Sequence, residues 1–411
     1  MTCVAVVGTG LLGRGIAEVI VRHGVKVILH DSAPASLDSA RQHITQLAAP
    51  LGVEVSAEAS LEAAAAADFV LEAVVENLEL KQQIFSRLGA ANARAILMSN
   101  SSVLPIGEIA RYTPAPERAV GTHWWNPPQL IPVVELIRGP HTSAEVLQRC
   151  AQLLRQLGKQ PIHVERDVPG FVGNRLQHAL WREAIGLVAA GVSAASVDRV
   201  IAATLGVTLA HRGPIAEMGR LGLLQVQLQL HHYLPLIVSE RGPSQLLRDK
   251  VAAGDLGAKS GRGFFPWPAG AREQSAARLQ QYVQRRLRSG VPDPGREPEG
   301  SPALPPAEIA LAERLRAALW REALALVADG VCDAATVDLM ACNTIGLRLA
   351  SMAPLENADY VGLDLTLAIH EAVLPSLNAS TVVPPLLPHI IPATHSVSST
   401  SPSHPHHPHR R

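Results

Sequence analysis

An apolar run followed at once by closely spaced glycines restricts what the first domain of this chain can be. Val4–Val7 is typical of a buried strand, and Gly8–Gly13 has the spacing Gly-x-Gly-x-x-Gly. Glycines at this spacing permit a tight turn, close approach of the backbone to a pyrophosphate, and packing of the next helix on the strand. The pattern therefore predicts a dinucleotide-binding βαβ unit with an anion at the helix N-terminus. The predicted phosphate-binding residues are Gly8, Gly10, Leu11, Leu12 and Gly13.

An acidic residue at the end of the second predicted strand indicates which dinucleotide binds. Asp31 follows the strand-like segment Lys26–His30, 18 residues after Gly13. A carboxylate there accepts hydrogen bonds from the adenosine ribose and repels a 2′-phosphate, so the sequence predicts NAD and not NADP. The alternative interpretation is a glycine-rich turn of another α/β protein, with Asp31 as a helix cap.

Strand-like and helix-like segments alternate through the first 165 residues, which predicts a parallel sheet covered by helices. The predicted helices include Gly13–His23, Leu80–Ala90 and Ser143–Leu157. The predicted strands are Val4–Val7, Lys26–His30, Phe69–Ala73, Ala95–Ser99, Val133–Ile137 and Ile162–Glu165. From Pro169 to Ile237, apolar residues recur every three or four positions, which predicts helices.

A segment of the helical part occurs twice. Residues 174–191 read NRLQHALWREAIGLVAAG, and residues 313–330 read ERLRAALWREALALVADG. The similarity continues beyond both segments with one inserted residue, so we interpret it as a duplicated helical domain. Trp181 and Trp320 occupy equivalent positions and are predicted core residues. The repeated WREA run predicts a salt bridge or a cap in each copy.

These patterns divide the chain. We predict an NAD-binding Rossmann domain at residues 1–167, a first helical domain at 168–290, a linker at 291–308 and a second, partial helical repeat at 309–380. The linker is rich in Pro, Gly and Glu. Residues 381–411 are rich in Pro, Ser and His, which predicts a disordered tail.

Composition argues against several classes of protein. The 36 Lys and Arg balance the 36 Asp and Glu, so charge gives no reason to expect nucleic acid or an anionic membrane as partner. No stretch of about 18 apolar residues lacks charges, and the N-terminus does not read as a signal peptide. The four scattered cysteines show neither zinc nor disulfide spacing, and His231-His232 lacks a nearby carboxylate. We therefore expect no metal site and a cytoplasmic protein.

A histidine and a glutamate twelve residues apart form the predicted chemical centre. Histidine suits alcohol oxidation because its ordinary pKa lies near working pH, so His123 can take and return a hydroxyl proton. Glu135 lies on an otherwise apolar strand, where a carboxylate needs a partner such as an imidazole. The residues alone equally allow His123 to cap a turn and Glu135 to face solvent.

Four segments in order resemble the 3-hydroxyacyl-CoA dehydrogenase family. They are SNSSVLPIGEIA, THWWNPPQLIPVVEL, DVPGFVGNRL and GDLGAKSGRGFF, and the resemblance covers roughly residues 2–270. It implies that His123 is the general base and Glu135 its partner, and that Ser102 and Asn174 bind the substrate. The cofactor contacts assigned on the same basis are Glu76, Lys81 and Asn100. The implied fold is an α/β N-terminal Rossmann domain followed by two tandem all-α domains of the 6-phosphogluconate-dehydrogenase-like C-terminal type.

The resemblance leaves the small-molecule substrate open. The family usually carries a long basic hairpin after the second strand that touches coenzyme A, whereas here Asp31 and Glu72 are about forty residues apart, with only Arg41 and His43 between as basic residues. We expect NAD-dependent interconversion of 3-hydroxyacyl-CoA and 3-oxoacyl-CoA. The alternative is a dehydrogenase of a free 3-hydroxy acid or small alcohol, similar to gulonate and carnitine dehydrogenases. A non-enzymatic structural protein, as in lens crystallins, is disfavoured by the joint presence of Ser102, His123, Glu135 and Asn174.

The duplication resembles the dehydrogenase portion of multifunctional fatty-acid oxidation proteins. In single-copy relatives this domain forms the dimer interface, so a tandem copy predicts a monomer with an internal pseudo-dimer, with a homodimer as the alternative. Asn174 aligns with Glu313, so we expect the second copy to be structural. Trp124 and Trp125 replace two phenylalanines of the family, and they either narrow the pocket or serve only packing.

Overall fold

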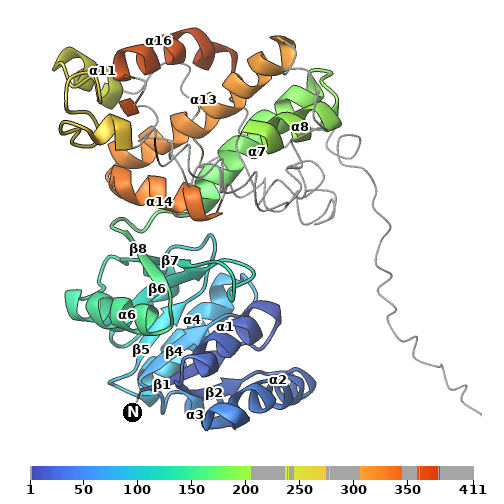
Figure 1. The fold of residues 1–411 in the computed structure, drawn as a ribbon. Helices are drawn as coiled ribbons and strands as arrows, with labels where there is room; N and C mark the ends of the chain where they lie inside the picture. Colours follow the sequence, from blue (N-terminus) through green and yellow to red (C-terminus); the bar gives the residue numbers. More distant parts are fainter. Residues whose placement is uncertain are drawn as a thin grey trace, which may run out of the picture.

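The chain folds into two lobes, as the computed structural model in Figure 1 shows. The structure describes residues 2–204, 237, 239, 245–274, 277, 306–344, 359, 360, 362–377 and 379. The lower lobe in that view holds a sheet with helices around it, and the upper lobe is helical. This arrangement confirms the expected Rossmann-like domain followed by a helical region.

An eight-stranded sheet organises the lower lobe, with strand order β3-β2-β1-β4-β5-β6-β7-β8. The strands are β1 Cys3–Val7, β2 Lys26–His30, β3 Val55–Ala57, β4 Phe69–Glu72, β5 Ile96–Ser99, β6 Ala119–Trp124, β7 Val133–Ile137 and β8 Gln160–Val164. The helical segments are α1 Leu11–Arg22, α2 Pro34–Ala48, η1 Ala49–Leu51, α3 Leu61–Ala64, α4 Leu78–Ala91, α5 Ile106–Ile109, η2 Pro116–Arg118 and α6 Ala144–Gln156.

The predicted parallel sheet contains one antiparallel pairing. Strands β3, β2, β1, β4, β5 and β6 are parallel, but β7 runs antiparallel to β6. Only residues 125–132 join β6 to β7, and a parallel crossover needs a dozen residues or more. The sequence patterns also missed β3, which has three residues, and β6, whose Gly-Thr-His run interrupts its apolar residues.

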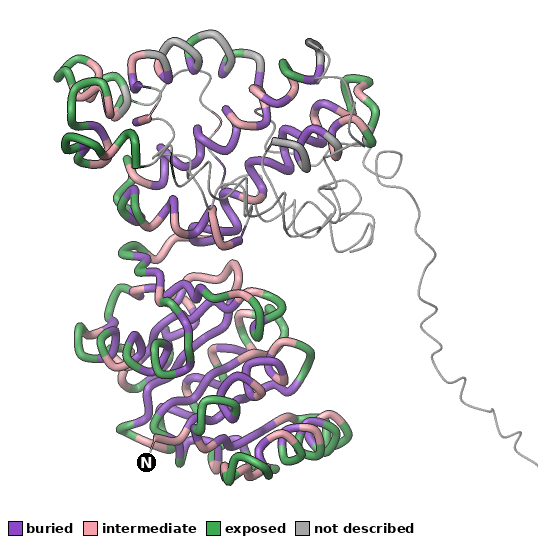
Figure 2. The backbone as a smooth tube through the Cα atoms, in the orientation of Figure 1, coloured by how far each residue is buried: buried purple, intermediate pink, exposed green. Residues whose placement is uncertain are grey.

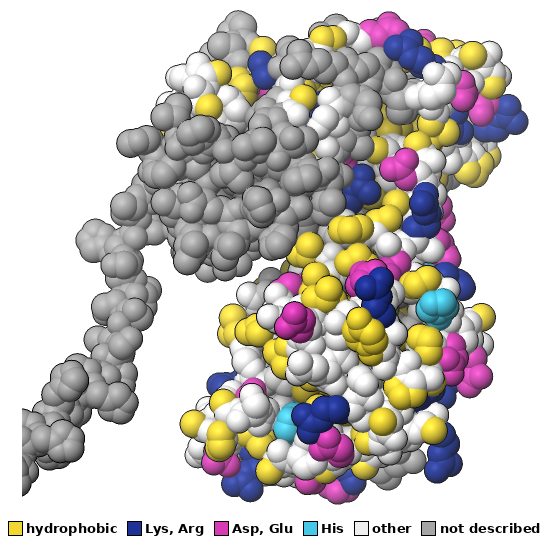
Figure 3. All heavy atoms as spheres, turned by 180° about the vertical axis from the view of Figure 1, so that it is seen from behind, with side chains coloured by type: hydrophobic (Ala, Val, Ile, Leu, Met, Phe, Trp, Pro, Cys, Tyr) yellow, Lys and Arg dark blue, Asp and Glu magenta, His cyan; other side chains and the backbone are white. Residues whose placement is uncertain are grey.

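Both faces of the sheet are covered, as expected for parallel strands. In β1, Ala5 and Val7 pack into one buried cluster, and Val4 and Val6 pack into another. Figure 2 shows the buried backbone concentrated in the strands of the lower lobe. Seen from behind, the described surface of that lobe carries basic and acidic side chains interspersed (Figure 3).

The upper lobe is built around two long helices that pack against each other, α7 (Gly173–Ala189) and α13 (Pro306–Ala328). Trp181 and Trp320, one on each helix, are buried, which confirms them as core residues. The other described elements of this lobe are α8 Ala194–Thr204, α11 Gln245–Ala252, α14 Ala334–Thr344, α16 Leu363–Val373 and η4 Leu374–Ser376.

Two ion pairs join α7 to α13 in a symmetric way. Arg175 lies 2.5 Å from Glu322, and Arg314 lies 2.7 Å from Glu183. In the repeat alignment Arg175 corresponds to Arg314, and Glu183 corresponds to Glu322. Each glutamate of the repeated WREA run therefore pairs with an arginine of the other copy, as in an interface related by a two-fold axis.

A residue of the second helical segment, Asp359, binds the backbone of a turn in the first segment, at residues 263–267. The carboxylate of Asp359, which is fully buried, accepts hydrogen bonds from the backbone of Phe264 (2.8 Å) and Phe265 (2.7 Å) and from Nε1 of Trp267 (3.0 Å). A Cβ at Gly263 would lie 2.1 Å from Oδ1 of Asp359, so glycine is required for this close approach.

The predicted linker needs a correction at its end, because α13 begins at Pro306, inside the range 291–308. Proline suits the first turn of a helix, where its missing N–H has no partner to lose. The rest of the linker, the tail at 381–411 and the helices expected between 205 and 236 lie outside the described residues. Among the helices the structure does describe, none combines the length and hydrophobicity needed to cross a membrane.

Candidate active site

The glycine loop between β1 and α1 leaves the start of a helix open. Gly8 has a φ of +94°, and a Cβ there would lie 2.7 Å from the carbonyl oxygen of Ala73. A Cβ at Gly13 would lie 1.9 Å from the carbonyl oxygen of Gly8, whereas nothing lies within 4 Å of one at Gly10. Gly10 is the N-cap of α1 and provides no side-chain cap. The N–H groups of the first turn, including those of Leu11 and Leu12, are thus available to an anion such as a pyrophosphate.

The loop also lies where the strand order reverses, since β2 and β4 flank β1 on opposite sides. Ligands of open α/β sheets bind in the crevice at such a point, beyond the carboxyl ends of the strands. Asp31, at the end of β2, accepts hydrogen bonds from the backbone N–H of Thr9 (2.7 Å), the Thr9 hydroxyl (2.9 Å) and the N–H of Ala33 (2.9 Å). Partial burial raises the pKa of Asp31, but these hydrogen bonds outweigh it and hold the pKa below its ordinary value. The carboxylate is therefore charged beside the loop, which fits NAD.

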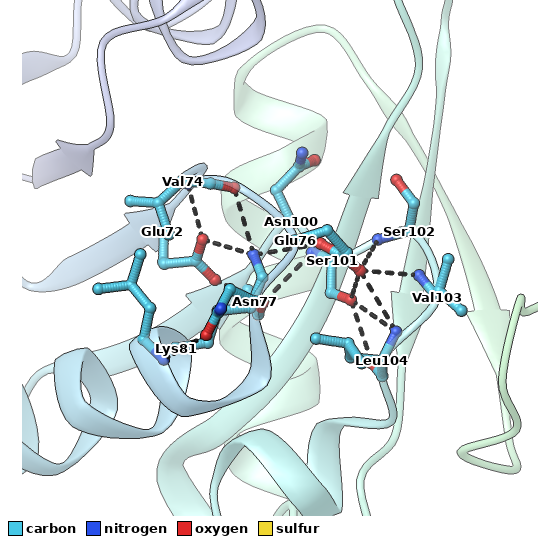
Figure 4. A network of polar contacts seen from close by, with 12 residues as sticks. Glu72, Val74, Glu76, Asn77, Lys81, Asn100, Ser101, Ser102, Val103 and Leu104 are labelled. Carbon is cyan, nitrogen blue, oxygen red and sulfur yellow. Dashed lines mark hydrogen bonds and ion pairs between the residues drawn. The ribbon is translucent and has the colours of Figure 1, made fainter. Parts of the chain in front are cut away.

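A buried lysine joins two glutamates at the carboxyl end of β4 (Figure 4). Nζ of Lys81, on α4, lies 2.7 Å from Oε1 of Glu72 and 3.4 Å from Oε2 of Glu76, and the lysine is fully buried. Glu72 also accepts hydrogen bonds from the Ser99 hydroxyl (2.8 Å) and the Val74 N–H (2.7 Å). Lys81 is thus part of a buried network of charges and not a solvated residue of a helix surface.

Glu76 binds the loop that follows β5 through several hydrogen bonds. Its Oε1 accepts hydrogen bonds from the Ser101 hydroxyl and from the backbone of Ser102 (3.1 Å), Val103 (3.0 Å) and Leu104 (3.3 Å). Burial raises the pKa of Glu76, but the Lys81 ammonium and these donors outweigh it and keep the pKa low. In the structure Glu76 and Lys81 therefore engage protein groups, beyond the carboxyl end of β4, the strand that pairs with β1 beside the glycine loop.

His123 and Glu135 face each other across the antiparallel strands β6 and β7, where they are direct cross-strand partners. Nδ1 of His123 lies 2.6 Å from Oε2 of Glu135, and the two residues are 4% and 0% exposed. The alternative in which Glu135 faces solvent is therefore wrong. The twelve-residue spacing works because the chain reverses between the strands and brings both side chains to one face of the sheet.

Three further N–H groups point at Glu135. Its Oε1 accepts hydrogen bonds from the backbone of Val172 (2.9 Å) and Gly173 (3.1 Å) at the start of α7, and its Oε2 lies 3.3 Å from Nε1 of Trp125. A helix N-terminus favours a negative charge. The chain enters this helix through Phe171, a fully buried residue in the left-handed region with a φ of +47°. Such a backbone conformation is strained, at a cost of about 1–2 kcal/mol for a residue other than glycine.

The remaining predicted residues lie around this pair. Nδ2 of Asn174, in the first turn of α7, donates a hydrogen bond to the carbonyl oxygen of Ser102 (3.2 Å), which joins the helical lobe to the loop after β5. Oδ1 of Asn100 accepts a hydrogen bond from the backbone of Trp124 (2.8 Å), next to His123. The structure thus places the predicted substrate residues Ser102 and Asn174 in contact with each other, and the predicted cofactor residue Asn100 beside the strand that carries His123.

Several residues of this site were not predicted. Glu72 could have been suspected, because it ends an apolar strand as Asp31 does. The contact of Trp125 with Glu135 had only the replacement of phenylalanine as a signal. Met340 of the second helical copy, whose Cε would lie 2.6 Å from a Cβ at Gly173, had no signal at all.

Comparison with known proteins agrees with this geometry. The model of the NAD-binding domain of 3-hydroxyacyl-CoA dehydrogenase matches residues 3–168, and that of the C-terminal domain of 3-hydroxyacyl-CoA dehydrogenase matches residues 170–267 and 311–399. A 5-formyl-3-hydroxy-2-methylpyridine 4-carboxylate 5-dehydrogenase from Mesorhizobium japonicum is 32% identical, over 70% of this chain and 98% of that protein. A protein named probable 3-hydroxybutyryl-CoA dehydrogenase from Bacillus subtilis is 35% identical, over 64% of this chain and 96% of its own length.

A solved structure shares the fold over most of the chain. The 3-hydroxybutyryl-CoA dehydrogenase of Escherichia coli K12 superposes with a TM-score of 0.61, at 22% identity, over 89% of this chain and 90% of that one. The Rossmann-like domain, the open glycine loop and Asp31 define an NAD-dependent oxidoreductase. Within that class, the chain belongs to the 3-hydroxyacyl-CoA dehydrogenase family.

Proposed function

We propose that this protein interconverts 3-hydroxyacyl-CoA and 3-oxoacyl-CoA with NAD, and that His123 is its general acid and base. The observation that carries the proposal is the buried His123–Glu135 pair, with 2.6 Å between Nδ1 and Oε2. An imidazole held this way by a carboxylate is suited to taking a proton from a hydroxyl group, because its cation is stabilised as it forms.

The hydrogen bonds assign the proton positions. An ionised carboxylate can only accept, so Nδ1 of neutral His123 carries the proton that Glu135 accepts, and Nε2 has the free lone pair. In oxidation, Nε2 takes the hydroxyl proton of the substrate while the carbon–hydrogen bond breaks and the carbon–oxygen double bond forms. NAD, when bound, supplies the acceptor for the hydride. In the reverse direction the imidazolium returns the proton to the oxygen.

We further propose that Ser102 and Asn174 hold the substrate and that Gly8, Gly10, Leu11, Leu12, Gly13, Asp31 and Asn100 hold the cofactor. The Asn174–Ser102 contact supports the first role, since it holds the loop after β5 against the first turn of α7, whose start also binds Glu135. Glu76 and Lys81 would then shape the nicotinamide end of the crevice through the loop at 101–104.

The decisive variant is His123→Ala. Turnover should fall about 10²–10⁴-fold, the usual contribution of general acid–base catalysis, with NAD binding retained. His163→Ala is a matched control, because His163 is exposed on β8. Steady-state rates and calorimetry with NAD measure the two effects. Undiminished turnover in His123→Ala would exclude the role.

A free 3-hydroxy acid or small alcohol is the second candidate substrate, and α2 favours it. The helix that follows β2, α2, carries only two basic residues, Arg41 and His43. Arg41 already lies 3.6 Å from the carboxylate of Asp38. Little positive charge there is left for a coenzyme A phosphate. Comparing kcat/KM for acetoacetyl-CoA with values for free 3-hydroxy acids separates the candidates; a preference for the free acids rejects the thioester.

We also propose a cytoplasmic monomer in which α7 and α13 form the interface that single-copy relatives form between subunits, with the second copy structural. The symmetric Arg–Glu pairs support this arrangement, and the four cysteines, all of which lie within the described residues, form no disulfide with one another, as in a reducing compartment. Size-exclusion chromatography with light scattering should give the mass of one chain. A dimer built through α7 would contradict the proposal.

A further inference from the structure

Trp125 occupies a fixed position between the dyad and the helical lobe. Its indole Nε1 lies 3.3 Å from Oε2 of Glu135, and its ring centroid lies 5.3 Å from that of His123. A Cβ at Gly173 would lie 2.3 Å from Cζ2 of the indole, so the ring rests directly on the backbone of α7. The orientation of its N–H is thus set by packing on both sides.

This contact concerns the same carboxylate oxygen that His123 uses. Oε1 of Glu135 is occupied by the N–H groups of Val172 and Gly173, and Oε2 by His123 and Trp125. A carboxylate offers about four acceptor positions, so four donors saturate it. A donor that shares Oε2 withdraws negative charge from the imidazole and weakens the stabilisation of its cation.

Among the described residues, the charges of Arg175 and Asp333 act together with that of Glu135 on the buried Cys332, which places both in the neighbourhood of the dyad. Arg175 of α7 is paired with Glu322 at 2.5 Å. Cys332 and Asp333 follow α13, and burial, together with the negative charge of Glu135 and Asp333, raises the pKa of Cys332 to about 12, so its thiol is neutral. Arg175 is thus neutralised by Glu322, and Glu135 is the carboxylate in direct contact with the imidazole.

We propose that Trp125 is a positioning residue that tunes the strength of the catalytic base: its indole N–H shares Oε2 of Glu135 with His123, and this sets the pH range in which His123 is neutral and active. The proposal rests on the role assigned to His123 above. A phenylalanine at position 125 could not perform this task, because a phenyl ring has no N–H to donate.

The neighbouring tryptophan provides a matched control. Trp124 is buried at 3% exposure, its ring lies 5.9 Å from Nζ of Lys159, and within the described residues its Nε1 has no hydrogen-bond partner. Trp124→Phe therefore makes the same chemical change at the adjacent position, the loss of an indole N–H, but Glu135 keeps all its donors.

The test compares the pH dependence of the two variants in the full-length protein. In Trp125→Phe, the pH at which NAD-dependent oxidation of 3-hydroxybutyryl-CoA reaches half its maximum should rise by about half a pH unit, because an ordinary hydrogen bond corresponds to a shift of that order. Trp124→Phe should keep the wild-type profile. Titration of His123 by NMR, with labelled histidine and a His123→Gln variant to assign its signal, should show the same shift without any substrate.

The outcomes separate this inference from the proposed function. The role of Trp125 is supported if the midpoints of the activity profile and of the NMR titration both rise in Trp125→Phe and neither rises in Trp124→Phe. An unchanged or lowered midpoint in an active Trp125→Phe enzyme overturns it and leaves His123 as the base. If His123→Ala is fully active, the proposed function fails instead, whereas the NMR titration still decides whether Trp125 acts on His123.

Discussion

Lys81 shows how much a single buried charge can depend on its partners. It is fully buried, and its ammonium group is balanced by Glu72 and Glu76. Removing one partner of a buried ion pair leaves an uncompensated charge and typically costs about 3–5 kcal/mol. Lys81→Met should therefore lower the thermal midpoint of the N-terminal lobe by on the order of 10 °C, measured by circular dichroism.

A surface pair gives the control for that prediction. Lys259 and Asp364 lie 2.8 Å apart but are 41% and 44% exposed. Exposed pairs contribute about 0–1 kcal/mol, so Lys259→Met should leave the midpoint nearly unchanged. Equal effects of the two substitutions would show that the buried lysine is not held by its carboxylates.

The individual site residues were predictable to different degrees. The pairing of His123 with Glu135 rested on the resemblance of the surrounding motifs to the family, because the residues alone equally allowed Glu135 to face solvent. The antiparallel strands that bring the two side chains face to face could not be predicted, since β6 was not recognised. Lys81 could not be placed, because its burial depends on Glu72, which comes from another element. The donors to Glu135 could not be predicted either, because Val172 and Gly173 contribute backbone N–H groups, which no side-chain motif indicates.

At the scale of elements, helix α7 links the dyad to the interior of the helical lobe. His178 lies on it, fully buried, with Nδ1 2.7 Å from the carbonyl oxygen of Asn174. Burial lowers the pKa of His178 from 6.5 to about 3, and the hydrogen bond only partly opposes this. The folded protein therefore holds this imidazole neutral, whereas the unfolded chain protonates it below about pH 6.5.

The sign of the pH effect follows. The unfolded state binds one more proton than the folded state between about pH 6.5 and 3, so His178 makes stability fall as pH decreases through that range. His178→Phe should flatten this part of the curve of thermal midpoint against pH. The exposed His163→Phe should not change it. A slope unaltered in His178→Phe would mean that other groups control acid unfolding.

Elements were predicted best where the pattern was periodic or apolar. The helices α1, α4 and α6 and most strands appear within one or two residues of their predicted bounds. Strand β6 was missed because burial of Gly121, Thr122 and His123 is imposed by the strands on both sides and not by hydrophobicity. The direction of β7 depended on the length of a connection whose first strand was not recognised.

At the scale of the whole molecule, the two ion pairs between α7 and α13 are symmetric in sequence but not in burial. Arg175 and Glu322 are 7% and 0% exposed, whereas Arg314 is 33% exposed beside a buried Glu183. Glu322→Gln should therefore lower the free energy of unfolding of the helical lobe by about 3–5 kcal/mol, and Glu183→Gln should lower it by less. Urea denaturation followed by tryptophan fluorescence compares the two. The reverse order would show that water reaches the first pair.

The hydrogen bonds that Asp359 makes to Phe264, Phe265 and Trp267 span more than ninety residues of chain, and the Arg175–Glu322 pair spans 147. Contacts so distant in sequence form slowly, because the intervening loop must close first. During synthesis, α7 leaves the ribosome long before α13 exists to cover it. Until α13 has been synthesised, the apolar face of α7 stays exposed on the nascent chain. During that time chaperones can bind it, or it can aggregate. Because both helical copies belong to one polypeptide, the association of α7 with α13 does not depend on protein concentration, and its timing depends on the speed of translation.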